Sequence, residues 1–342
     1  MSEALLIVAH GTRSQAGREE CDVLTARVRD LRPALTVEVG YLELSPPPIS
    51  ETVDRLARGG VTDITAVPLV LLAAGHAKGD VPAAIARERA RHPRVGFRYG
   101  AALGIHPDVL AVTAERIDAV VDEASRSATA VLLVGRGTSD PDANGDLAKV
   151  ARLLWEGRPY PLVEPAFVSL AEPSVPQALE RCRRLGADRI VVFSYFLFTG
   201  VLEDRIRAQA QQWAAGRPGV TVTSAGYLGP DDRLAGLLLE RYDQARAGTT
   251  RVNCDACVYR VALPGFEDRV GQPQTLHFHP DDEAPTATPT SQLPAPGRLP
   301  VDPAAMAVVC TATGVEGAPQ VSGRRLTLRP VARPPHKRYK YI

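Results

Sequence analysis

The chain has 342 residues, of which 45% are hydrophobic and 23% charged, and these are ordinary values for a globular protein. At roughly 150 residues per domain, this length predicts about two domains. The net charge of +1 creates no global field that would attract nucleic acid or a membrane, so we expect neither as a partner. An acidic ligand would have to be bound by local arginines.

The N-terminal apolar run, LLIVA, is too short for a signal peptide core or a membrane span. No other segment approaches the ~18 apolar residues that a transmembrane helix needs. We therefore expect a soluble, cytoplasmic protein. The five cysteines of this long chain do not predict a disulfide framework, and only Cys254 and Cys257 are spaced as a pair.

The first part of the chain alternates short apolar runs with segments of helical spacing. Continuous apolar runs such as ITAVPLVLLAA indicate strands buried on both faces, which is typical of a parallel sheet. The alternation predicts a doubly wound α/β sheet of about four strands, with ligands bound at the carboxyl ends of the strands. The expected strands are 4–9, 35–42, 62–72 and 94–99, and the expected helices are 14–31, 49–59, 78–91 and 107–126.

The same pattern then occurs a second time. Residues 5–14 match 131–140 and residues 37–44 match 163–170, both at an offset of 126, since 131 − 5 = 126 and 163 − 37 = 126. Residues 67–81 match 192–206 at an offset of 192 − 67 = 125, and LGIHPDVL resembles the later LGPDDRL. Such a repeat indicates a tandem duplication. We expect an N-terminal lobe at 1–126 and a second lobe at 127–247, facing each other across a cleft.

The tail, residues 248–342, has a different composition. It contains NCDACVYR, then HFHPDD with His277 and His279, and then a proline-rich stretch that is typical of an extended linker. The sequence predicts no globular fold for it, and we expect an irregular tail.

Three metal-ligating side chains follow strands of the first lobe. His10 ends the first strand, Glu43 the second, and His76 follows the third. Because the carboxyl ends of parallel strands share one edge of a sheet, we expect these side chains to meet there. Two imidazoles and one carboxylate form an open site that suits Co, Ni, Fe or Zn. A single histidine at a strand end is more often structural, but three such residues in one lobe favour a metal site.

The second lobe lacks this set. The residues that align with His10, Glu43 and His76 are Arg136, Ser169 and Val201. Drift could explain the loss, but specialisation explains it better, with one lobe holding the metal and the other binding an organic substrate. The Arg136 guanidinium is well suited to a carboxylate of that substrate.

The motifs LLIVAHGTRS, YLE and VPLVLLAAGHAKGDVP resemble the sirohydrochlorin chelatase family, the class II chelatases that insert cobalt or iron into a tetrapyrrole. The duplication resembles the long, cobalt-inserting form of that family, and the resemblance covers roughly residues 1–245. It implies a lyase-type enzyme of cobalamin or sirohaem biosynthesis whose substrates are sirohydrochlorin and a divalent metal, Co²⁺ first and Fe²⁺ next.

The resemblance also implies roles for individual residues. His10 and His76 would bind the metal and accept the pyrrole protons, with Glu43 assisting. Arg13, Lys78 and Arg136 would bind substrate carboxylates. The small, apolar segment formed by Leu71, Leu72, Ala73, Ala74 and Gly75 would line the face of the macrocycle.

The resemblance further connects the tail to an iron–sulfur cluster on Cys254 and Cys257, but this chain has a reduced histidine set there, and the sequence favours two thiols in a tail loop over a cluster. Two other functions stay open, a non-enzymatic metal carrier and a histidine phosphatase-like hydrolase. The latter follows from HGT after a strand, although Ala9 stands where such enzymes have an arginine. The sequence leaves the physiological metal, the pathway and the choice between monomer and homodimer undetermined.

Overall fold

A computed structural model of the chain describes residues 2–252, 257–263 and 266–272. Each sequence repeat forms a four-stranded, all-parallel sheet, which confirms the predicted α/β fold. The first sheet has the order β2-β1-β3-β4, with β1 (Glu3–Ala9), β2 (Thr36–Tyr41), β3 (Asp63–Pro68) and β4 (Gly96–Tyr99). The second sheet has the order β6-β5-β7-β8, with β5 (Thr129–Gly135), β6 (Val163–Phe167), β7 (Arg189–Ser194) and β8 (Thr221–Ser224).

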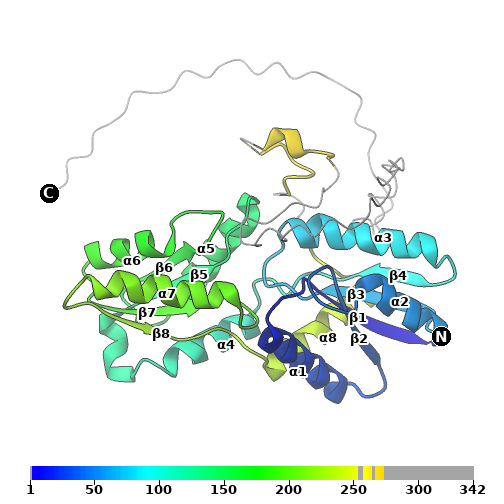
Figure 1. Cartoon of the computed structure of the whole chain (residues 1–342), viewed down its shortest axis with the longest axis horizontal. Coiled ribbons are helices and arrows are strands. Elements are labelled where there is room, and N and C mark those ends of the chain that lie inside the picture. The colour runs from blue at the N-terminus through cyan, green and yellow to red at the C-terminus, as the bar shows by residue number, and fades with distance from the viewer. Residues whose placement is uncertain (1, 253–256, 264–265, 273–342) are drawn as a thin grey trace, which may run out of the picture.

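Helices cover both faces of each sheet, so the central strands are buried on both sides (Figure 1). In β1, Leu5 to Ile7 are 0% exposed, and in β5 the same holds for Ala130 to Val134. This burial explains why the strands are continuously apolar instead of alternating. The helices are α1 (Gln15–Leu31), α2 (Ile49–Arg58), α3 (Val81–Arg91), α4 (Pro107–Asp118), α5 (Pro141–Trp155), α6 (Val175–Arg184), α7 (Val201–Ala215) and α8 (Asp232–Arg246).

Some element boundaries differ from the sequence-based expectation. The third strand ends at Pro68 instead of residue 72, because proline has no N–H to donate to a strand ladder. The chain then leaves the sheet and forms one turn of π-helix, η1 (His76–Asp80), before α3. The fourth helix ends at Asp118, and Asp122 caps a separate 3₁₀ turn, η2 (Glu123–Ala128).

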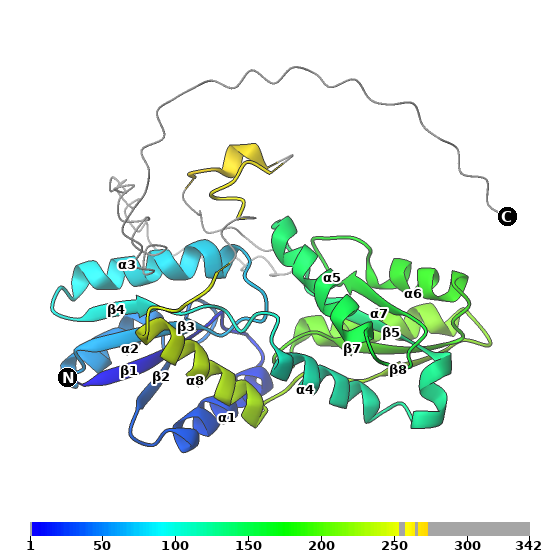
Figure 2. The ribbon, with the colours of Figure 1, turned by 180° about the vertical axis from the view of Figure 1, so that it is seen from behind.

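The last helix of each repeat packs on the other repeat. The helix α8 contacts α1, β3 and β4 of the first lobe. The helix α4 contacts α5 and β7 of the second lobe. Both views of the ribbon show this exchange (Figures 1 and 2). One hydrophobic core consequently runs through both lobes, since Val109 of α4 and Leu238 of α8 belong to the same cluster as strand residues of both sheets. The boundaries at 126 and 247 themselves stay predictions.

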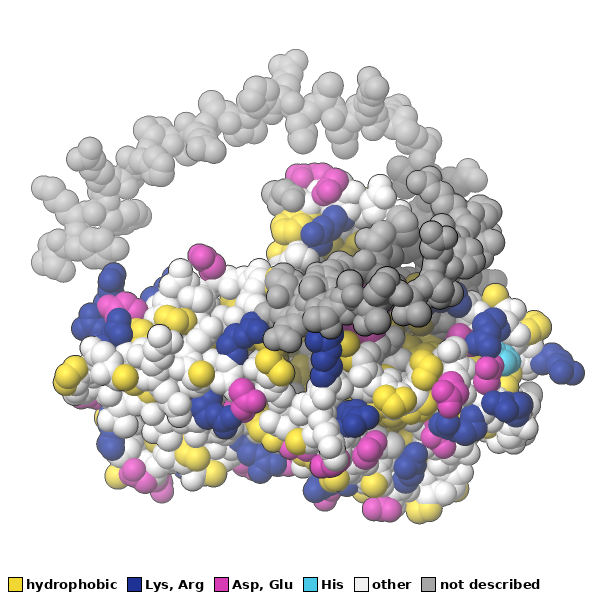
Figure 3. Space-filling view, in the orientation of Figure 1, with side chains coloured by type: hydrophobic (Ala, Val, Ile, Leu, Met, Phe, Trp, Pro, Cys, Tyr) yellow, Lys and Arg dark blue, Asp and Glu magenta, His cyan; other side chains and the backbone are white. Residues whose placement is uncertain are grey.

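The described tail residues form a short segment beside the junction of the lobes, including the 3₁₀ turn η3 (Glu267–Arg269). The proline-rich stretch, His277 and His279 lie outside the described residues. Within the part of the chain that the structure describes, no helix combines the length and the hydropathy that a membrane span requires. Acidic and basic side chains are interspersed over the face seen in Figure 3.

Candidate metal centre

The turn after β1 brings His10 next to Glu43. Because β1 and β2 are neighbours in the sheet, the chain continues their pairing beyond the strands, and the Glu43 N–H donates to the His10 carbonyl at 3.0 Å. Gly11 makes this close approach possible. It has a φ of +101°, and a Cβ at this position would lie 1.8 Å from the Glu43 carbonyl oxygen. Only glycine fits here without moving the backbone.

The side chains of His10, Glu43 and His76 converge, although they are far apart in the sequence. His10 Nε2 lies 3.2 Å from His76 Nε2 and 3.1 Å from Glu43 Oε1. The imidazole rings meet edge to face, with their centroids 4.5 Å apart. The side chains are 25% (His10), 33% (Glu43) and 17% (His76) exposed, so solvent reaches part of the site.

Hydrogen bonds fix the orientation of both rings. The Nδ1 atom of His10 lies 3.2 Å from the Gly11 carbonyl oxygen, and Nδ1 of His76 lies 2.6 Å from the carboxylate of Asp80, which is only 6% exposed. Both partners accept hydrogen bonds, so each Nδ1 acts as a donor, and in the neutral imidazole each Nε2 is then the atom whose lone pair can bind a metal. At 3.2 Å, two such nitrogens can share either a proton or a metal ion.

The arrangement is therefore suited to a divalent metal ion. Two imidazole nitrogens and one carboxylate oxygen are ligands that Co²⁺, Fe²⁺, Ni²⁺ and Zn²⁺ accept, and three protein ligands leave positions open for a second molecule. A carboxylate on the distal nitrogen of a ligating histidine is a common support of metal sites. The sequence analysis missed Asp80, although its spacing of four residues from His76 in a helical segment was a usable signal.

The second lobe repeats the backbone of this site. The Ser169 N–H donates to the Arg136 carbonyl at 3.0 Å, and Gly137 has a φ of +85°, with the Ser169 carbonyl oxygen 1.9 Å from the position of a Cβ. Val201, which aligns with His76, begins α7 and is 64% exposed. None of the side chains at these three positions is a preferred metal ligand.

The predicted substrate-contacting residues lie around the same edge. Arg13 is exposed, Arg136 is half-buried, and Leu71 is buried. The half-buried residues of the loop that leads into η1 are Leu72, Ala73, Ala74 and Gly75. Their contact with a substrate stays a prediction.

Lys78 contacts the other lobe instead of facing open solvent. Its Nζ lies 2.8 Å from Asp140 Oδ2 and 2.8 Å from Asp142 Oδ2, at the N-terminus of α5. Burial alone would lower the pKa of Lys78, but the hydrogen bonds to both aspartates outweigh it and raise that pKa. Sequence reasoning did not find these aspartates, because they belong to a different sequence repeat.

The cysteine pair of the tail is described only in part. Cys257 is a free thiol, 7% exposed, whereas Cys254 lies outside the described residues. The iron–sulfur cluster predicted for this pair stays a prediction.

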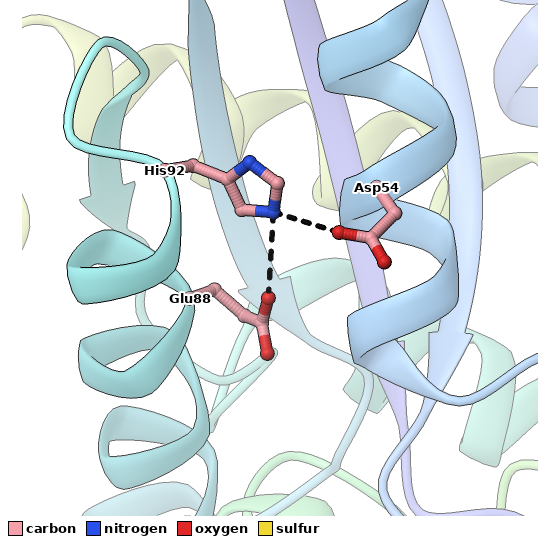
Figure 4. A group of neighbouring side chains, drawn as sticks. All are labelled: Asp54, Glu88 and His92. Atoms are coloured by element: carbon pink, nitrogen blue, oxygen red, sulfur yellow. Dashed lines mark hydrogen bonds and ion pairs between the residues drawn. The ribbon is translucent and has the colours of Figure 1, made fainter.

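A second group of potential metal ligands lies between α2 and α3, away from the carboxyl ends of the strands (Figure 4). His92 Nε2 is 2.8 Å from Asp54 and 3.9 Å from Glu88. Arg91 binds both carboxylates, and its hydrogen bonds lower the pKa of Asp54. A metal ion would have to displace this guanidinium, so we interpret the group as an ion-pair network that joins the two helices.

Comparison with known proteins gives consistent matches over both lobes. The CbiX family model matches residues 4–120 and, a second time, residues 130–245. A sirohydrochlorin cobaltochelatase of Priestia megaterium is 36% identical over 263 residues, which are 76% of this chain and 86% of that protein. A sirohydrochlorin ferrochelatase of the same organism is 33% identical over 69% of this chain and 88% of its own. The solved structure of SirB from Bacillus subtilis with Fe³⁺ superimposes with a TM-score of 0.64 at 30% identity, covering 73% of this chain and 97% of that one.

Proposed function

Because this chain belongs to the CbiX family, we propose that it is a sirohydrochlorin chelatase, an enzyme that inserts a divalent metal ion into sirohydrochlorin. Relatives named for this activity match most of the chain, and the chain covers most of their length. The observation that carries the proposal at the level of residues is the pair of Nε2 atoms, 3.2 Å apart, that face each other with both Nδ1 atoms already hydrogen-bonded.

In the proposed mechanism, His10, His76 and Glu43 hold the metal ion at the edge of the first sheet. Insertion forms four metal–nitrogen bonds in the macrocycle and releases two pyrrole protons, which water removes poorly. As metal–imidazole bonds break, each freed Nε2 lone pair is in position to accept one of these protons. A site with three protein ligands instead of four also favours release of the ion.

The second lobe is proposed to bind the organic substrate. Arg136 occupies the position of His10 there and would pair with a carboxylate of the macrocycle, with Arg13 contributing from the first lobe. The loop from Leu71 to Gly75 would pack on the apolar ring face directly before His76.

Cobalt is the metal that we favour, followed by iron. The relative named for cobalt insertion is 36% identical over 76% of this chain, compared with 33% over 69% for the relative named for iron insertion. The ligand set itself accepts either ion. Turnover with each metal at equal free concentration would decide between them. The predicted cluster on Cys254 and Cys257 is not needed for any step above.

The absorbance change of sirohydrochlorin with Co²⁺ tests the proposed function. We expect turnover by the full-length protein, and a loss of about a hundredfold or more in His76→Ala, the usual scale for removing an acid–base group. His92→Ala is the matched control, because it removes a histidine of the same lobe from the network of Figure 4 and should leave turnover unchanged. Stoichiometric Co²⁺ binding without insertion would instead indicate a metal carrier, and phosphate release would indicate a hydrolase.

A further inference from the structure

Lys78, Asp140 and Asp142 form a contact between the lobes, which we name the Lys78 bridge. Both distances from Nζ are 2.8 Å, and the three side chains are 10%, 3% and 10% exposed. Asp140 also caps α5, where its Oδ1 accepts the N–H of Asp142. Removing one partner of an ion pair as buried as this one is costly, because the remaining charge is left without a counter-charge where little water can solvate it.

The Lys78 bridge lies on the same turn as a proposed metal ligand, His76. Lys78 lies on η1, the single π-turn that begins with His76 and ends with Asp80. The N–H of Val81 donates to the His76 carbonyl and closes that turn. A shift of Lys78 therefore shifts the backbone of His76 and the carboxylate that orients its ring. Short π-turns of this kind are frequent at functional sites.

We propose that Lys78 is a positioning residue, through which the second lobe controls the metal affinity of the first. With the bridge formed, η1 is held at α5, and His76 faces His10 at the distance observed. With the bridge broken, η1 loses this attachment to α5 but keeps contacts within the first lobe, such as the hydrogen bond from the Tyr99 hydroxyl to the Ala77 carbonyl. The inference rests on the proposed function only in taking His10 and His76 as the metal ligands.

The other side of the junction offers a natural control. Glu20 of α1 accepts hydrogen bonds from the Thr199 N–H at 2.8 Å and from the Tyr227 hydroxyl at 2.5 Å. This contact also joins the two lobes, but no residue in it lies on η1 or next to a proposed ligand in the sequence. Weakening this contact tests whether the loss of any contact between the lobes lowers the Co²⁺ affinity, or whether that affinity depends specifically on the Lys78 bridge.

The proposal predicts an effect at a distance that substrate docking by Lys78 does not. Asp142→Asn alters only the second lobe and removes no proposed ligand, yet it should weaken Co²⁺ binding by about fivefold or more, the lower range of typical coupling between sites. Because such coupling is reciprocal, bound Co²⁺ should in turn stabilise the Lys78 bridge. Hydrogen exchange at the N-terminus of α5 should therefore be slower with Co²⁺ than without it. If Lys78 instead served to dock a substrate carboxylate, Asp142→Asn would leave it with one aspartate, Asp140, in place of two, and the KM for sirohydrochlorin would fall while Co²⁺ affinity stayed the same.

The experiment is a titration of the full-length protein with Co²⁺ alone, followed by its visible absorption, together with hydrogen exchange of the same samples. The variants are Asp142→Asn, Lys78→Met and the double variant, with Glu20→Ala as control. We expect weaker Co²⁺ binding and faster exchange around η1 and the start of α5 in all three bridge variants. The double variant should be no weaker than Lys78→Met, because both remove the same contact.

Unchanged Co²⁺ affinity in Asp142→Asn would overturn the proposal, as would an equal loss of affinity in Glu20→Ala. Additive losses in the double variant would also contradict it. If the wild-type protein did not bind Co²⁺ at all, the proposed metal site would fail. The exchange data would still show independently whether the bridge holds η1 against α5.

Discussion

In the first lobe the turn after the central strand holds His10 beside Glu43, whereas in the second lobe the same turn holds Arg136 beside Ser169. The backbone is the same in both places, with a positive-φ glycine passing close to a carbonyl oxygen and the same sheet order around it. At this turn the side chains differ, and at the third proposed ligand position the backbone differs as well, because His76 begins the π-turn η1 whereas Val201 begins α7. The fold thus supplies a turn that holds two side chains next to each other, and we propose that their identity suits one turn to a metal ion and the other to an anion.

The largest expected effect concerns the ligand pair. His10→Ala should lower the rate of Co²⁺ insertion by about a hundredfold or more, because it removes both a metal ligand and a proton acceptor. Val201→Ala changes the second-lobe residue that aligns with His76 and should leave that rate unchanged. Comparing initial rates of the folded variants tests the division of roles, and near-normal turnover in His10→Ala would show that the ligand assignment is wrong.

The two positive-φ glycines sharpen the comparison. Gly11→Ala and Gly137→Ala each place a Cβ within 2 Å of a carbonyl oxygen, at 1.8 Å and 1.9 Å respectively. Both should lower the free energy of unfolding by at least about 1–3 kcal/mol, the scale of local backbone strain. Only Gly11→Ala should also weaken Co²⁺ binding. Denaturant unfolding and metal titration of both variants check this, and equal losses of Co²⁺ affinity would contradict the assignment of the metal to one lobe.

A smaller effect is expected from the arginine of the second lobe. Arg136→Ala should raise the KM for sirohydrochlorin by about tenfold, the scale of one charge-assisted hydrogen bond, and change Co²⁺ affinity much less. Arg136→Lys retains the charge but not the planar pair of donors and should recover part of the loss. An unchanged KM together with lost metal binding would reverse the roles given to the two lobes.

The sequence predicted the sheets and the proposed ligands because the signals for both are local. The central strand β1 is buried on both faces and continuously apolar, and His10 directly follows it, whereas Glu43 comes two residues after the edge strand β2. The partners of Lys78 could not be predicted, because they lie more than sixty residues away in another repeat and no periodicity connects them. The exchange of α4 and α8 was missed for the same reason, since an amphipathic helix shows that it packs but not on which sheet.

The smallest effect is expected from the tail. Truncation near residue 248 leaves α8, both sheets and the three proposed ligands intact. We expect Co²⁺ insertion to stay within about twofold of the full-length rate, because none of the removed residues that the structure describes belongs to either sheet. The described tail residues do approach the second lobe, where Arg269 lies 3.4 Å from the Ser139 hydroxyl. A folded truncation without activity would show that the tail contributes to the site.

The central claim is that one lobe holds the metal and the other does not. Anomalous diffraction at the cobalt edge, from crystals of the full-length protein grown with Co²⁺, tests it most directly. We predict a cobalt peak bonded to Nε2 of His10, Nε2 of His76 and the carboxylate of Glu43, with no peak at Arg136. Cobalt bound at the second lobe, or only at Asp54, Glu88 and His92, would contradict this account.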